Sequence, residues 1–199
     1  MLSANFFLHF SLPFSLFFKF KYEVKDEMKE YMYKYDSPAG ILTIRSDGVN
    51  ITGLWIKEPD VKGDTEIQEV SEYDLSVFKV AKKWLDIYFI GKEPNFIPPL
   101  KTNGTIFREA VCEMLREIPY GQVITYGDIA KKMTFQIGKA KMSAQAVGGA
   151  VGSNPISILI PCHRVVGVNG NLTGYGGGLD IKVQLLQLEG LDMERFYTP

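Results

Sequence analysis

The first half of the chain alternates apolar and polar positions from Tyr31 onward. In "YMYKYDSPAGILTIRSDGVNITGLWI", residues 31–56, turn signals interrupt the alternation at Ser37-Pro38-Ala39-Gly40 and at Asp47-Gly48. Alternation between such turns predicts a meander of about three strands, each half-buried. Residues 70–91 then carry apolar side chains at helical spacing and end at Gly91, a residue suited to a helix C-cap. We expect a small sheet followed by one helix.

Residues 92–104 are rich in proline and glycine and read as a linker. We place a domain boundary there. The predicted division is a doubtful N-terminal extension over residues 1–30, an N-terminal α/β structural domain over 31–98, and a C-terminal domain over 99–199 that carries the chemistry.

The second half predicts short helices around one apolar run. "TIFREAVCEMLREIPYG" is an amphipathic helix stopped by Pro119 and Gly121, and "TYGDIAKKM" is a short helix that Thr125 caps. "MSAQAVGGAVGSN" is a further helix, and two short helices in succession are compatible with a helix-turn-helix. "PISILIPCHRVV" predicts a short buried strand ending at Pro161. A glycine loop, residues 167–178, and a helix ending at Gly190 follow.

The N-terminal stretch "NFFLHFSLPFSLFFKF" is rich in phenylalanine but broken by His9, Pro13 and several serines. It is shorter than the about 18–20 apolar residues that span a bilayer. It also lacks the basic start and the cleavage site of a signal peptide. We expect no membrane segment and interpret residues 1–30 as a non-native extension, with Met28 or Met32 as the natural start. Finding Met1 or Leu2 at the terminus of the natural protein would contradict this.

Composition and charge exclude several classes. The 199 residues are 46% hydrophobic and 23% charged with a net charge of −1, as in an ordinary globular protein. Residues 121–182 hold six basic and two acidic residues, which suits either a phosphate-facing surface or a solvated lysine-rich helix face. Two cysteines and two histidines are too few for a disulfide framework or a Cys/His zinc site. We expect no metal and no cofactor, and a reducing, cytoplasmic location.

The stretch "NPISILIPCHRVVG", residues 154–167, raises the question of what Cys162 does. A free cysteine is more often a small buried hydrophobe, and Cys112 fits that interpretation in the middle of a predicted helix. Cys162 differs because it follows Pro161, where the chain turns, and precedes His163. An imidazole or a polarised water lowers a thiol pKa, and the thiolate is the nucleophile. The Cys-His pair alone leaves packing and chemistry both open.

The whole stretch closely resembles the active-site signature of the O6-alkylguanine-DNA alkyltransferases, also called methylated-DNA–protein-cysteine methyltransferases. The resemblance runs from "FREAVCEMLREIPYGQVITYGDIA" through "AVGGAVGSNPISILIPCHRVVGVNGNLTGYGGGLDIKVQLLQLEG" and extends more weakly to "SPAGILTI". It implies an α+β fold: an N-terminal α/β, ribonuclease-H-like domain and a mostly helical C-terminal domain of helix-turn-helix, winged-helix-like type. It also implies DNA repair by irreversible, single-turnover transfer of the alkyl group from O6-alkylguanine to the protein's own cysteine, with O4-alkylthymine a further substrate. The implied partner is double-stranded DNA, bound in the minor groove by a monomer that flips the base.

The resemblance also implies roles for individual residues. Cys162 matches the alkyl-accepting cysteine, His163 a residue that acts on it through a water, and Glu189 the carboxylate that orients this histidine. Asn154 matches an asparagine that holds the active-site turn together. Tyr126 matches a tyrosine that donates to the guanine ring, although by itself it reads as a core aromatic. Glu189 by itself is a charge at a helix C-terminus, where the helix dipole disfavours it unless it has a partner.

Further positions match substrate and DNA contacts in the family. Tyr175, Gly176 and Gly177 match the pocket wall, Lys182 matches a lysine below the pocket or is a solvated helix lysine, and Arg164 and Val165 follow the acceptor cysteine as expected substrate contacts. Gln145 stands where many members carry an arginine that fills the gap left by the flipped base, so we predict weaker DNA binding. The turn "TFQIGKAKM" looks longer than in some relatives, and its lysines offer phosphate contacts.

Three alternatives remain beside this interpretation. An alkyltransferase-like protein would recognise the lesion without transfer, but that class lacks the cysteine. A DNA-binding regulator would use the helix-turn-helix and would not need Cys162 or Glu189. A Cys-His hydrolase would turn over repeatedly, and its only further histidine would be His9 in the doubtful extension.

Overall fold

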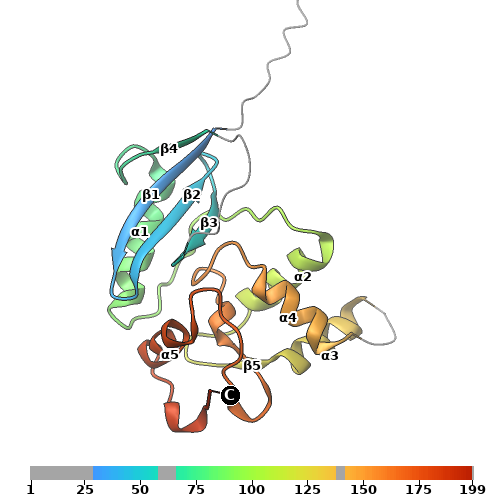
Figure 1. Ribbon diagram of the computed structural model, residues 1–199. Coiled ribbons are helices and arrows are strands. Elements are labelled where there is room, and N and C mark those ends of the chain that lie inside the picture. Colours follow the sequence, from blue (N-terminus) through green and yellow to red (C-terminus); the bar gives the residue numbers. More distant parts are fainter. Residues whose placement is uncertain (1–28, 58–65, 138–141, 199) are drawn as a thin grey trace, which may run out of the picture.

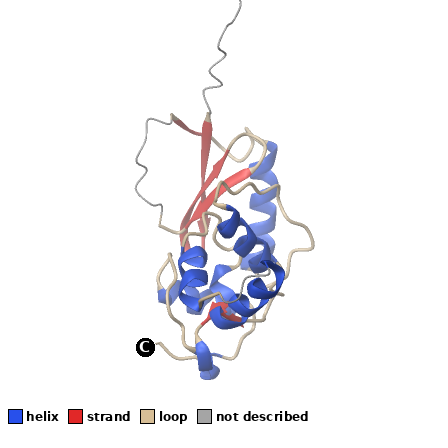
Figure 2. Cartoon of the chain, turned by 90° about the vertical axis from the view of Figure 1, so that its right-hand side faces the viewer, coloured by secondary structure: helices blue, strands red, loops and turns tan. Residues whose placement is uncertain are grey.

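The computed structural model describes residues 29–57, 66–137 and 142–198, so residues 1–28 of the predicted extension lie outside the described residues. A small twisted sheet with one long helix forms the N-terminal part, and a group of shorter helices forms the C-terminal part (Figure 1). The view turned by 90° shows the same two parts, with strands concentrated in one and helices in the other (Figure 2). This is the α+β architecture that the sequence predicted. None of the described helices is long and apolar enough to cross a membrane.

The N-terminal sheet has the strand order β3-β2-β1-β4. β1 pairs antiparallel with β2 and β2 with β3, which confirms the predicted meander. The short β4 runs parallel to β1 and was missed, because one apolar residue in three gives no readable pattern. The elements are β1 (Glu30–Ser37), β2 (Gly40–Ser46), β3 (Ile51–Trp55), β4 (Ile67–Glu69) and α1 (Ser76–Phe89).

Helix α1 packs its apolar stripe against this sheet. Phe78, Leu85 and Tyr88 on α1 and Leu42 and Ile44 on β2 have no exposed surface. Each fully buried apolar side chain of this size contributes about 1.5–3 kcal/mol to folding. The helix is followed by Gly91 in the left-handed region (φ 75°), which confirms the predicted glycine stop.

The C-terminal part consists of α2 (Ile106–Arg116), β5 (Ile124–Thr125), α3 (Tyr126–Ile137), α4 (Ala144–Gly152), the 3₁₀ turn η1 (Cys162–Arg164), β6 (Val165–Val166), η2 (Val168–Gly170), α5 (Leu179–Leu188) and η3 (Met193–Arg195). Thr125 caps α3 as predicted, since its hydroxyl accepts from Asp128 N at 3.1 Å, and Ser143, which was not predicted as a cap, accepts from Ala146 N at 3.1 Å at the start of α4. Helices α3 and α4 pack against each other. α3 continues to Ile137, so much of the predicted long turn is helical, and residues 138–141 with its two lysines lie outside the described residues.

The strand predicted over residues 155–161 is wrong. These residues form tight turns, in which Ile160 N donates to Ile156 O at 3.0 Å and Leu159 N to Ser157 O at 2.8 Å. Ile158 adopts a left-handed conformation (φ 69°), which is strained for a β-branched residue. The apolar run is buried because it turns inside the protein, and its buried apolar side chains offset the strain.

The end of β3 holds this turn in place. Leu54 N donates to Pro155 O at 2.9 Å, and Ser157 N donates to Leu54 O at 2.9 Å. One large cluster of buried apolar side chains also runs through both parts of the chain. The N-terminal sheet therefore supports the segment that leads to Cys162. The domain boundary at residues 98/99 stays a prediction.

Candidate active site

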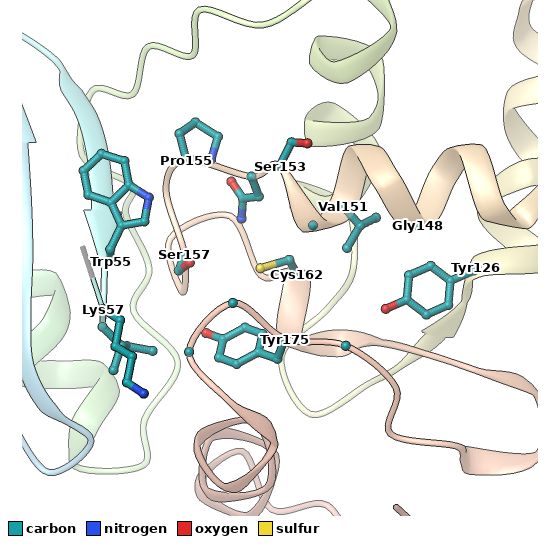
Figure 3. Close-up of a pocket in the computed structure, with 16 residues that line it drawn as sticks. Trp55, Lys57, Tyr126, Gly148, Val151, Ser153, Pro155, Ser157, Cys162 and Tyr175 are labelled. Atoms are coloured by element: carbon teal, nitrogen blue, oxygen red, sulfur yellow. The ribbon is translucent and has the colours of Figure 1, made fainter. Parts of the chain in front are cut away.

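Cys162 lines a cavity of about 890 Å³ that both parts of the chain enclose. Its walls are the end of β3, the start of α3, the end of α4, the turn that begins at Ser153 and the glycine loop around Tyr175. Figure 3 shows Tyr126 on one side of the cysteine, Trp55 and Lys57 on the other side, and Tyr175 facing it. A cavity in the range of about 300–1,000 Å³ suits a small-molecule-sized group such as a base.

Asn154 ties the turn before the cysteine together. Its Nδ2 donates to Ile160 O at 2.8 Å, and its Oδ1 accepts from Ile156 N at 3.0 Å. The side chain is 8% exposed. One amide side chain thus replaces the backbone pairing that the turn gives up, as expected for a residue that shapes a turn.

The Cys162 thiol lies on the wall of the cavity with 7% of the residue exposed. Burial raises its pKa, while the Asn154 side chain, the Lys182 ammonium and the Ser157 side chain act in the opposite direction. Burial therefore outweighs the neighbours that lower the pKa, and the pKa of the thiol lies above its ordinary value in the free protein. The thiol is stored protonated and needs a base in reach.

His163, the residue that follows the cysteine, provides a buried, neutral imidazole. Its Nε2 lies 2.7 Å from Glu189 Oε1, so Nε2 carries the proton and donates it. Burial lowers the pKa of His163, with Glu189 acting in the opposite direction. Its Nδ1 is buried and has no hydrogen-bond partner in the described part of the chain. A buried, unpaired lone pair on a neutral imidazole is a proton acceptor.

Glu189 is the centre of a buried polar network. Its Oε1 accepts from His163, from Tyr88 Oη at 2.8 Å and from Arg164 Nη2 at 3.0 Å. Its Oε2 accepts from Arg164 Nε at 2.9 Å and from Gly121 N at 3.1 Å. Burial raises the pKa of Glu189, but the hydrogen bond from His163 and the hydrogen bonds and charge of Arg164 outweigh it and hold this pKa at about 2. The carboxylate is saturated with donors, so it fixes the imidazole without taking its proton.

The side chains of Arg164 and Val165, which were predicted to contact the substrate, instead make contacts inside the protein. The Arg164 guanidinium is buried against Glu189, and its Nη1 donates to Ile118 O at 2.6 Å. The Val165 side chain is fully buried. A guanidinium with its donors occupied in this way is a structural partner of the carboxylate, and the spacing of residues along the chain did not indicate this.

Lys182 lies entirely inside the protein, so the alternative of a solvated helix lysine is wrong. Its Nζ donates to Val165 O at 2.6 Å and to Thr173 O at 3.2 Å. Burial lowers its pKa to about 8, and the Cys162 sulfur acts in the opposite direction. Through these two hydrogen bonds the ammonium connects the strand after the cysteine with the glycine loop. It also places a positive charge near the thiol.

Tyr126, Tyr175, Gly176 and Gly177 all lie where a cavity wall was expected. Tyr126 Oη currently donates to Thr173 O at 3.2 Å, and Figure 3 shows its hydroxyl turned toward the cavity. Gln145 is different: it is exposed on the first turn of α4 and does not line the cavity.

Tyr88 is a site residue that sequence reasoning missed. It comes from α1 in the N-terminal part, is fully buried, and stands 3.3 Å from His163 Nε2 as well as 2.8 Å from Glu189. On the sequence it is one more apolar position of an amphipathic helix. Only the spatial meeting of α1 with α5 shows its hydroxyl to be part of the network.

We expect Tyr88→Phe to leave the fold intact and to remove about 1.5–3 kcal/mol of stability, the contribution of a hydrogen bond to a charged group. Glu189 keeps four of its five donors, so the imidazole loses orientation without losing its anchor. Urea unfolding measures the first effect, and the pH profile of thiol alkylation by a small reagent measures the second. An unchanged pH profile would show that Tyr88 is only a packing residue.

Chemically, the site offers one nucleophile, one neutral base and a fixed carboxylate, in the order of an activated-nucleophile triad. In the described part of the chain no group of three or more His, Cys, Asp and Glu side chains is placed to hold a metal ion. The fold and this site define a protein whose reactive group is a cysteine in a base-sized cavity.

Comparisons with known proteins identify the family. Residues 31–102 match the model described as "6-O-methylguanine DNA methyltransferase, ribonuclease-like domain", and residues 106–191 match "6-O-methylguanine DNA methyltransferase, DNA binding domain". The chain belongs to the methylated-DNA–protein-cysteine methyltransferase family and is an enzyme of direct DNA repair by alkyl transfer.

Individual relatives agree with this. A methylated-DNA–protein-cysteine methyltransferase of Haemophilus influenzae is 45% identical over 156 residues, 78% of this chain and 83% of the relative. One of Methanosarcina acetivorans is 41% identical over 78% of this chain and 96% of its own length. The crystal structure of the Mycobacterium tuberculosis O6-methylguanine methyltransferase has a TM-score of 0.69 at 40% identity, covering 80% of this chain and 92% of that one. A structure of the M. tuberculosis protein in complex with DNA has a TM-score of 0.67 at 38% identity, covering 83% and 94%.

Proposed function

We propose that the protein repairs O6-alkylguanine in double-stranded DNA by accepting the alkyl group on Cys162 in a single turnover. The observation that carries this proposal is the placement of the thiol on the wall of a base-sized cavity, next in sequence to a neutral imidazole that Glu189 holds in place. In this arrangement a single base activates a single nucleophile.

The proposed reaction has three parts. The thiol proton passes to His163 Nδ1 through a bridging water, since no direct hydrogen bond joins the two side chains in the described structure. The sulfur then attacks the alkyl carbon, forming a C–S bond as the C–O6 bond breaks. Tyr126 Oη gives its proton to the guanine ring as negative charge develops there, and the base leaves as guanine. The proton that His163 took from the thiol is released to water, and Tyr126 Oη takes up a proton from water, so one proton passes in net from the thiol to the base. The resulting thioether has no easy leaving group, so Cys162 is not regenerated.

The depth of the site supports base flipping. The O6 atom of a stacked guanine faces its pairing partner, and the Cys162 thiol lies inside a cavity where a duplex cannot enter. The base must therefore rotate out of the stack. Alkylation weakens its pairing, so extrusion costs less at damaged sites.

Helix α4 presents a surface suited to the minor groove. Its buried side is Val147, Ala150 and Val151, whereas Ala144, Gln145, Ala146, Gly149 and Gly152 are exposed. A side chain added at Gly149 or Gly152 would meet nothing within 4 Å. These small exposed residues let the helix backbone approach the floor of a narrow groove, and the helix ends at the cavity.

Incubation with an oligonucleotide containing O6-methylguanine tests the proposal. Intact mass is expected to rise by one methyl group and to stop there with substrate in excess, and peptide mapping places the group on Cys162. Repeated turnover, or a lesion that persists in excess protein, would contradict it.

We also propose that the protein acts as a monomer in the cytoplasm, where its two free cysteines stay reduced. Light scattering with and without DNA measures the oligomeric state.

We expect Gln145→Arg to strengthen DNA binding and to steepen its salt dependence. A guanidinium adds a positive charge and a stacking plane to the exposed first turn of α4, and each additional phosphate contact changes the slope of log K against log salt by about 0.9. Fluorescence anisotropy across a salt series measures both quantities. Gln187→Arg, which adds the same charge at an exposed position of α5, is the matched control. Equal slopes for Gln145→Arg and the parent would remove the idea.

A further inference from the structure

We propose that residues 55–57, at the end of β3, form a subsite that selects O6 substituents that are elongated and end in a negative charge. The proposal rests on the proposed function and names a substrate class for it. Trp55, Ile56 and Lys57 line the same cavity as Cys162, although they belong to the N-terminal part of the chain. The sequence suggested only a structural role for that part.

The segment is continuous with the wall around the cysteine. A Cβ added at Gly177 would lie 2.8 Å from Ile56 Cδ1 and 3.0 Å from Tyr175 Cε1. The glycine loop therefore closes directly on Ile56. On its other side, β3 is hydrogen-bonded through Leu54 to the turn that precedes Cys162. The end of β3 is thus fixed from two directions.

The indole ring of Trp55 is held in one orientation by its neighbours. A Cβ added at Gly53 would lie 1.8 Å from the Trp55 ring, so the indole lies against the bare backbone of the residue two places before it. The Arg45 guanidinium, opposite Gly53 in the strand register, lies 5.6 Å from the centre of the ring. Gly53 and Arg45 together hold the ring in one orientation, so the part of Trp55 that lines the cavity offers an apolar surface at little entropy cost.

The in-line geometry of the displacement reaction directs a long O6 substituent toward Trp55. The attacking sulfur and the leaving O6 stand on opposite sides of the reacting carbon, so the rest of the substituent must extend sideways. With the base beside Tyr126, the side away from it runs past Ser157 to Trp55 and Lys57, as Figure 3 shows. A methyl group leaves this part of the cavity empty.

Lys57 gives the subsite its charge preference. Among the described residues that line the cavity, it alone carries a permanently charged group, and no described acidic side chain forms an ion pair with it. It is exposed at the end of the segment. An ammonium on the same side of the cavity as an aromatic ring suits a carboxylate at the end of an alkyl chain.

The test compares three duplex oligonucleotides that contain O6-methylguanine, O6-(3-carboxypropyl)guanine or its uncharged carbamoyl analogue. Single-turnover transfer rates give the acid-to-amide ratio, which isolates the charge, and the ratio of either long group to methyl, which isolates the length. We expect the parent to prefer the acid about three- to fivefold, the effect of one partly exposed ion pair. Lys57→Met, at an exposed position, should remove that preference and leave methyl transfer unchanged.

Trp55→Ala should slow both long substrates about tenfold relative to methyl. Tyr73→Ala, which removes an exposed aromatic ring outside the cavity wall, is the matched control and should change neither ratio. An acid-to-amide ratio of one in the parent, or a ratio that survives Lys57→Met, overturns the proposal. Equal slowing of all three substrates by Lys57→Met also overturns it and assigns Lys57 to the DNA backbone. Failure of methyl transfer in the parent instead defeats the proposed function, and the subsite with it.

Discussion

Replacing Cys162 by alanine is expected to abolish alkyl transfer completely. Cys162 carries the one sulfur among the described residues that line the cavity, and the thioether product requires that sulfur. The lesion should stay in the oligonucleotide however long the incubation, and the mass of the protein should not change. Binding to lesion-bearing DNA should persist, because the exposed face of α4 and the cavity wall are untouched.

Cys112→Ala is the matched control for that variant. Cys112 is also buried, with 3% exposed, but it lies on α2 and does not line the cavity. Burial raises its pKa to about 11, so it is an unreactive thiol at neutral pH. This variant should accept one methyl group as the parent does. Transfer to Cys112 in the Cys162→Ala protein would show that the site had been assigned to the wrong sulfur.

Much of the fold followed from local pattern. The meander, the glycine that stops α1 and the hydroxyl cap of α3 were predicted because each depends on a few neighbouring residues. The apolar run before Cys162 misled, since a buried turn and a buried strand have the same composition. Its shape depends on Asn154 and on two hydrogen bonds from β3, which are distant in sequence.

The site was predicted by resemblance more than by chemistry. The sequence places Cys162 and His163 together, but Glu189 lies 26 residues further on and Tyr88 lies 75 residues before His163. Nothing in this spacing shows that the Glu189 carboxylate accepts hydrogen bonds from both His163 and Tyr88. Likewise, the wall formed by Trp55 appears only when β3 is seen beside the active-site turn. Contacts between the two parts of the chain are what local sequence patterns leave out.

Glu189→Gln is expected to be the most destabilising single substitution in the network. The carboxylate receives five donors, and a carboxamide would turn an N–H toward the buried Arg164 guanidinium. Removing one partner of a buried ion pair costs about 3–5 kcal/mol, because the other charge stays buried without compensation. Urea unfolding measures this loss. Glu113→Gln, in an exposed pair with Arg116, should change stability by less than about 1 kcal/mol.

The pH dependence of unfolding separates lost charge from lost packing. The pKa of Glu189 is about 2 in the folded protein against an ordinary value of 4.5, so its stabilising contribution is complete above pH 4.5 and falls as the pH drops toward 2. The difference in unfolding free energy between parent and Glu189→Gln should therefore narrow over that interval. A second substitution, Arg164→Leu, should restore part of the stability lost in Glu189→Gln, since it removes the uncompensated charge. A difference that is constant with pH, together with no recovery in the double variant, would mean that the carboxylate acts through shape alone.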